Sequence, residues 1–196
     1  SSSSAASDVY KRQLYMFRVD TSSGNLNGLG EMPIISSSSA INNQLVHIGT
    51  GLGQTSDSET TWYVDTTQNP FRWETSPFAG ANATAQGYSW AAGTRDTRWA
   101  YHNLANSDYD FSISTLPVEG FATNFKDEDG FGMAANNDSG SGLFVNIDDQ
   151  WQLAGIVHSV AGFNGQPAST SVYGNLTLCS DLSSYSDQIN DIILIP

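Results

Sequence analysis

The chain has 196 residues, and its 20 Asp and Glu against 7 Lys and Arg give a formal net charge of −13 at pH 7. Such an acidic protein repels polyanions, which excludes nucleic acid and anionic membranes as expected partners. Short apolar runs alternate with turns of Ser, Asn, Asp and Gly, a pattern typical of all-β proteins. Cys179 is the only cysteine, so we expect a buried thiol with no internal disulfide and no thiolate zinc site. We expect no cofactor and no other metal site.

The first thirteen residues have an origin unrelated to protein structure. Ser3–Gln13 is, codon for codon, the in-frame translation of a DNA adapter used in transposase-based sequencing libraries. A natural linker rich in Ser and Ala has no reason to match every codon. We therefore expect residues 1–13 to be adapter-derived rather than native, and to pack against nothing.

Three segments follow in the first third of the chain. Leu14–Val19 has the mixed apolar character of a strand, and Met32–Ile35 with Ser36–Ser39 indicates a linker. Gln44–Gly51 then alternates as a strand and ends in glycines. Because no helix follows, these glycines indicate a tight strand exit rather than a phosphate-binding loop.

The stretch Ser56–Asp110 is rich in aromatic residues and contains Trp62, Trp73, Trp90 and Trp99. Exposed tryptophans could stack on sugars or grip a peptide. Tryptophan is highly buried on average, however, so we expect these side chains to fill the barrel and its loops.

Two acidic clusters lie in polar segments of the chain. They consist of Asp108 and Asp110, and of Asp127, Glu128 and Asp129. Neither cluster has the regular spacing of a calcium-binding loop, so the pattern predicts solvated loops.

The motif with the clearest chemistry is Asn136–Gly142, which is followed directly by an apolar hairpin. A serine attacks a carbonyl only if its hydroxyl is exposed on a rigid loop, with backbone N–H groups converging on the oxygen that becomes negative. Gly140 and Gly142 can take a positive φ, and Asn137 tolerates one, so the loop can turn its amides inward. We predict that Ser139 is a nucleophile on a tight turn held by the two strands behind it.

Near the end of the chain, Leu182, Tyr185 and Ile189 recur at helical spacing. They follow Ser180 and Asp181, either of which can cap a helix. The spacing predicts a C-terminal helix that packs on the barrel and carries no chemistry.

Four segments of this part of the chain are similar to a known family. Asp138–Ser141 and Leu153–Val157, which ends Gly-Ile-Val, resemble the nucleophile loop and following strands of the chymotrypsin-like (trypsin-like) serine endopeptidases. Ser171–Gly174 and Asp181–Ile189 resemble that family's last strand and C-terminal helix. The resemblance implies an all-β fold: a chymotrypsin-like antiparallel β-barrel, the second of two, with a remnant strand of the first and a C-terminal helix.

The resemblance also implies a domain organisation. Residues 14–40 would be the remnant of the first barrel and a linker, and residues 41–191 the second barrel and C-terminal helix, with residues 192–196 as a tail. The barrel itself would cover roughly Ile41–Tyr173. Because Ser56–Asp110 is longer than a barrel of this family needs, we expect an insertion there.

The same resemblance implies the parts of an active site. It places an oxyanion hole at the amides of Asn137 and Ser139, although the family's usual glycine is Asn137 in this chain. It forms the primary substrate pocket from Met133, Ala134, Ala135 and Asn136. With the uncharged Met133 as the floor, cleavage after apolar or small residues is expected.

The other two members of the catalytic triad are not expected in this chain. By resemblance, the aspartate would stand at the position of Gln13, and the histidine further upstream. None of the three histidines here has the family's Ala-Ala-His setting, so we expect structural or surface roles for them. They are His47, His102 and His158, and His158 lies nearest to the nucleophile hairpin. The chain alone is therefore expected to be inactive.

These observations predict an N-terminally truncated, secreted serine-type endopeptidase, extracellular or periplasmic. It would be a monomer acting on protein or peptide substrates through an acyl-enzyme at Ser139. The alternative is a non-catalytic secreted β-barrel module that binds protein or carbohydrate. An Asp just before Leu14 and a His roughly one barrel earlier would favour the enzyme. A lipase-type hydrolase is disfavoured because Ser139 lacks Gly-x-Ser-x-Gly on a strand-to-helix turn.

Overall fold

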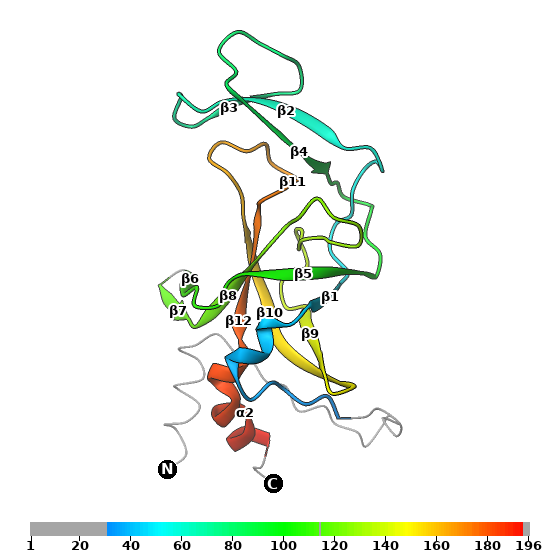
Figure 1. Ribbon diagram of the computed structural model, residues 1–196, viewed down its shortest axis with the longest axis vertical. Helices are drawn as coiled ribbons and strands as arrows, with labels where there is room; N and C mark the ends of the chain where they lie inside the picture. Colours follow the sequence, from blue (N-terminus) through cyan, green and yellow to red (C-terminus); the bar gives the residue numbers. More distant parts are fainter. Residues whose placement is uncertain (1–30, 114, 194–196) are drawn as a thin grey trace.

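Six antiparallel strands close into a barrel in the computed structural model, which describes residues 31–113 and 115–193 (Figure 1). In spatial order the strands are β1 (Leu45–Gly49), β5 (Arg98–Asn106), β8 (Gly120–Asn124), β12 (Leu176–Asp181), β10 (Gln150–Ala161) and β9 (Gly142–Ile147). Along the chain, the first four barrel strands are β1, β5, β8 and β9. The fourth, β9, lies beside the first, β1, and the resulting order β9-β1-β5-β8 is a Greek key. The predicted all-β barrel is confirmed. The expectations for residues 1–13 and for a strand at Leu14–Val19 lie outside the described residues.

A second sheet stands above the barrel in Figure 1 and is built mainly from the Ser56–Asp110 stretch. Its strands are, in order, β11 (Thr170–Val172), β4 (Ala83–Ser89), β2 (Thr60–Asp65) and β3 (Arg72–Glu74). The strands β2, β3 and β4 lie between the barrel strands β1 and β5 in the sequence but form a sheet outside the barrel. A ribbon of β6 (Phe111–Ile113) and β7 (Leu116–Val118) completes the strands.

The prediction that Ser171–Gly174 is the last barrel strand is wrong. Its first residues belong to β11, which pairs with β4 outside the barrel. Val172 packs there with Trp62 and Val64 in a small separate core. The barrel is closed instead by β12, which pairs with β8 and β10 and is buried from Thr177 to Asp181. The barrel therefore extends past its predicted end at Tyr173.

The four tryptophans of the insertion region have different surroundings. Trp62 and Trp90 are buried as predicted, and Trp73 is half-buried. Trp99 is 61% exposed, so the prediction is wrong for this residue. Successive side chains of a strand point to opposite faces, and Trp99 lies on β5 opposite the exposed Ile48 of β1, on the outer face.

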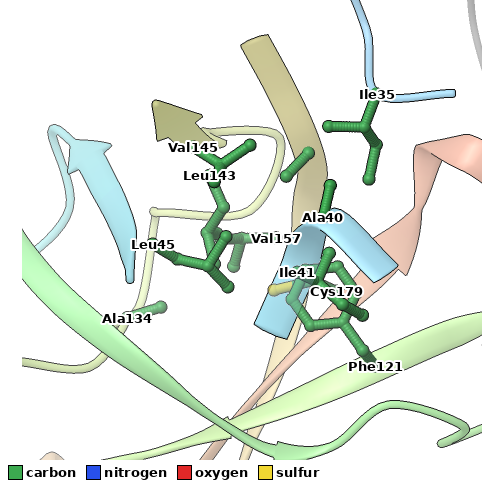
Figure 2. Close-up of a cluster of buried hydrophobic side chains, with 11 residues drawn as sticks. Ile35, Ala40, Ile41, Leu45, Phe121, Ala134, Leu143, Val145, Val157 and Cys179 are labelled. Carbon is green, nitrogen blue, oxygen red and sulfur yellow. The ribbon is translucent and has the colours of Figure 1, made fainter. Parts of the chain in front are cut away.

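The barrel interior holds one cluster of buried apolar side chains, which point toward one another in Figure 2. It consists of Ile35, Ala40, Ile41, Leu45, Phe121, Ala134, Leu143, Val145, Ala154, Val157 and Cys179. Cys179 is a free, fully buried thiol, as predicted, and burial raises the pKa of this thiol far above its usual range. Burial of this cluster is the main source of the barrel's stability.

The segment predicted as a linker, Met32–Ser39, is packed against the barrel. The Ile35 N–H donates to the Leu153 carbonyl at 3.1 Å, and the Leu153 N–H donates to the Pro33 carbonyl at 2.8 Å. The short 3-10 helix η1 (Ser38–Asn42) then buries Ile41. The segment packs instead of forming a free linker because burying its apolar side chains, such as Ile35, is favourable.

The C-terminal helix is confirmed, although it begins later than its apolar spacing suggests. Leu182 and Tyr185 are buried on a 3-10 turn, η2 (Leu182–Tyr185), which leads into α2 (Ser186–Ile193). Asp181 caps this turn by accepting a hydrogen bond from the Ser183 N–H at 2.9 Å.

Replacing Phe121 by Ala is expected to lower the free energy of unfolding by about 3–5 kcal/mol, because it leaves a cavity in the centre of the buried cluster. Equilibrium urea denaturation measures this loss. Trp99→Ala removes a larger but exposed side chain and should cost about 1 kcal/mol or less. Equal losses from the two substitutions would contradict the described core.

Candidate active site

The Asn136–Gly142 loop forms a tight turn that is tied to strand β10. Asn137 has φ 75° and Gly140 has φ 88°, so both adopt the left-handed conformation expected from the sequence. Gly142 does not, because it already belongs to the extended strand β9. The Gly140 N–H donates to the Val157 carbonyl at 2.8 Å, and the Val157 N–H donates to the Ser141 carbonyl at 2.9 Å. These reciprocal bonds hold the turn against the barrel on both sides of Gly140.

Ser139 projects its hydroxyl from the exposed side of this turn. The hydroxyl donates to the backbone carbonyl of His158 at 3.0 Å. Within the part of the chain that the structure describes, the N–H groups of Asn137 and Ser139 donate to no acceptor. The turn therefore presents an exposed hydroxyl and two unused backbone donors within three residues.

His158 contributes its carbonyl to Ser139, and its imidazole lies elsewhere. The residue is the extra one in a β-bulge between Val157 and Ser159. Its ring makes an edge contact with Phe111, with the ring centroids 5.7 Å apart. Burial lowers the pKa of this imidazole. Among residues 31–113 and 115–193, no imidazole is hydrogen-bonded to the Ser139 hydroxyl.

The carboxylate of Asp138 anchors the loop from beneath. This side chain is only 7% exposed, and its two oxygens accept from the Gly51 N–H at 2.6 Å and from the Ala135 N–H at 2.9 Å. A Cβ at Gly49 would overlap Asp138 Oδ1, and one at Gly51 would lie 2.5 Å from Asp138 Cγ. The glycines at the end of β1 are thus required by the approach of this carboxylate, consistent with the predicted tight strand exit.

A second contact holds the loop at Ser141, which the sequence did not single out. His47 Nε2 lies 2.7 Å from Ser141 Oγ, and Ser141 Oγ donates to the Asp138 carbonyl at 2.5 Å. Because the hydroxyl has one proton and gives it to the carbonyl, His47 Nε2 is the donor to Ser141. Burial lowers the pKa of His47, although the Asp138 carboxylate opposes this shift.

His102 lies next to His47 inside the barrel. The two rings make an edge contact with centroids 5.2 Å apart, and His102 Nδ1 lies 2.7 Å from Thr123 Oγ1. Full burial, with a smaller contribution from His47, lowers the pKa of His102 to about 3. Burial therefore keeps both imidazoles neutral at pH 7.

A cleft of about 670 Å³ opens beside the loop. Of the four residues expected to form the substrate pocket, Met133 and Ala135 line it. Ala134 instead points into the barrel core, where it is fully buried, and its N–H donates to Thr177 Oγ1 at 3.0 Å. Asn136 is exposed and lies outside the cleft lining. The alternation of side chains along this segment separates Ala134 from its two neighbours.

The acidic clusters have different positions. Asp127, Glu128 and Asp129 line the cleft, whereas Asp108 and Asp110 lie in a second hollow near η1. In the described part of the chain, no group of three or more His, Cys, Asp or Glu side chains could hold a metal ion. No helix among those residues is both long enough and apolar enough to cross a membrane.

Comparisons with protein-family models, with curated proteins and with solved structures found no match to this chain. The functional conclusion therefore depends on the geometry of the loop and the cleft.

Lowering the pH is expected to destabilise the protein through His102. Its folded-state pKa lies below the ordinary value of 6.5, so the unfolded chain takes up the proton first, and stability falls as the pH drops from about 6.5 toward 3. At about pH 4 this group alone removes about 3 kcal/mol relative to pH 7. Urea denaturation of the native chain and of His102→Gln at both pH values measures the effect. The same pH dependence in both proteins would contradict it.

Proposed function

We propose that the chain is part of a serine-type endopeptidase in which Ser139 is the nucleophile. The observation that carries the proposal is the exposed Ser139 hydroxyl on a restrained turn, beside the unused N–H groups of Asn137 and Ser139. Two backbone donors next to a nucleophilic oxygen are the arrangement that stabilises the oxyanion of a tetrahedral intermediate.

The proposed reaction is acyl transfer. Ser139 Oγ forms a bond to the carbonyl carbon of the scissile peptide, its proton passes to a base, and the amine leaves with a proton from that base. Water then attacks the acyl-enzyme and releases the carboxylic acid. The Asn137 and Ser139 amides donate to the negative oxygen in both steps.

The base is proposed to come from residues upstream of Leu14. In the structure, the Ser139 proton is held by the His158 carbonyl, which is too weak a base to remove it at neutral pH. The present chain is therefore expected to turn over peptides at a negligible rate. An upstream histidine that is oriented by an upstream aspartate would complete the site.

Ser141 is the competing nucleophile, because it is the serine hydrogen-bonded to an imidazole. We place it second for two reasons. Its proton is directed to the Asp138 carbonyl, and its partner His47, although it lines the cleft, is only 5% exposed. Ser141 is better suited to supporting the loop than to reaching a substrate.

Labelling with a fluorophosphonate probe, followed by peptide mapping, tests the proposal. The chain extended upstream by its natural sequence should be labelled rapidly at Ser139, and the present chain slowly. Ser139→Ala should abolish labelling, whereas the matched control Ser141→Ala should retain a measurable rate.

Three outcomes would contradict the proposal. Labelling at Ser141 would make it the nucleophile. Fast labelling of the present chain would show that a described residue supplies the base. An extended chain that is not labelled at all would favour the non-catalytic binding module.

A further inference from the structure

The cleft beside the loop has walls from both sheets. Barrel residues of β5 and of the 125–133 segment form one side, and the second sheet with its approach from β1 forms the other. The volume, about 670 Å³, is within the range of sites that enclose small ligands or a few residues of a peptide. The second sheet thus contributes part of the lining of this cleft.

Carboxylates outnumber cations in the lining. The acidic residues are Asp57 and Glu59 from the second-sheet side, Asp127, Glu128 and Asp129 from the barrel side, and the buried Asp138. The basic residues are Arg98 and Lys126. Arg98 donates to the carbonyls of Gly51 at 2.8 Å and Thr94 at 2.9 Å, and Lys126 pairs with Glu128 at 3.4 Å. Across the described residues, no cation pairs with the remaining exposed carboxylates of the lining, which are those of Asp57, Glu59, Asp127 and Asp129.

Glu59 is held in place without being neutralised. Its Oε1 accepts hydrogen bonds from the Tyr173 hydroxyl at 2.5 Å and the Tyr88 hydroxyl at 3.3 Å. The Phe125 ring supports both tyrosines, with centroid distances of 4.7 Å to Tyr173 and 6.5 Å to Tyr88. This arrangement presents a fixed negative charge on an aromatic wall.

Lys126 is an example of a cation bound by an aromatic ring and a carboxylate on the 125–133 segment. Its Nζ lies 5.6 Å from the centroid of the Phe131 ring while it pairs with Glu128. Aromatic faces attract cations, and the methylene stems of Lys and Arg pack well on such rings. Asp127 and Asp129 flank this pair along the chain and also line the cleft.

We propose that this cleft binds an extended peptide segment that carries two or more Lys or Arg residues. One cation pairs with Glu59 beside Tyr88, Phe125 and Tyr173, and another with Asp127 and Asp129 on the 125–133 segment. That the bound segment is a substrate rests on the proposed function, whereas its binding does not. Met133 remains an apolar part of the wall beside the nucleophile loop.

Isothermal titration calorimetry of the present chain tests the binding directly. The probe is acetyl-Ala-Arg-Ala-Arg-Ala-amide, and the control peptide has citrulline, which is uncharged and similar in shape, in place of both arginines. We expect binding of the arginine peptide only, weakening as salt rises from about 0.05 M to about 0.5 M. Glu59→Gln should weaken binding about threefold, and Glu59→Gln with Asp127→Asn and Asp129→Asn about tenfold.

Asp149→Asn is the matched control, since it removes one negative charge from an exposed turn outside the cleft. It should leave the affinity unchanged. Equal binding of both peptides, no binding of the arginine peptide, or an equal effect of Asp149→Asn and Glu59→Gln would overturn the proposal. Ser139→Ala should bind normally, so failed labelling of Ser139 with intact peptide binding would contradict the proposed function and leave this inference standing.

Discussion

The buried carboxylate of Asp138 is the contact on which the geometry of the candidate site depends. It joins the end of β1, through Gly51, to the start of the nucleophile loop, through Ala135. A buried carboxylate is tolerated only when its oxygens are hydrogen-bonded, so the two backbone segments must stay where they are. Ser139 follows directly in the sequence and inherits its position from this anchor.

The remaining supports of the loop are contacts of Ser141 and Gly140. His47 donates to Ser141, and Ser141 donates to the Asp138 carbonyl, so a buried imidazole on β1 fixes the backbone just before Ser139. Gly140 is held by β10. The turn is thus restrained from two strands, while its hydroxyl side is exposed. This division allows a reactive group to be rigid and accessible at the same time.

Local patterns in the sequence predicted the loop, the all-β class and the capped C-terminal helix, because turn conformation, strand alternation and capping each depend on neighbouring residues. Contacts between distant residues were not predictable in this way. His47 and Ser141 are 94 positions apart, and only the barrel brings them together. Glu59 lies at the cleft because the second sheet positions it there. Ile35 is buried because its backbone is hydrogen-bonded to β10. The glycines at the end of β1 were a usable signal for a tight strand exit. They have no Cβ, so the Asp138 carboxylate can approach the backbone there.

The central claim is that the Asn137 and Ser139 amides receive the oxyanion of a Ser139 adduct. A crystal structure of the upstream-extended protein, carrying a phosphonate on its reactive serine, tests this most directly. The account predicts phosphorus on Ser139 Oγ, with one phosphonyl oxygen about 2.7–3.1 Å from both amide nitrogens. An adduct on Ser141, or a Ser139 adduct whose oxygens all point to solvent, would contradict it.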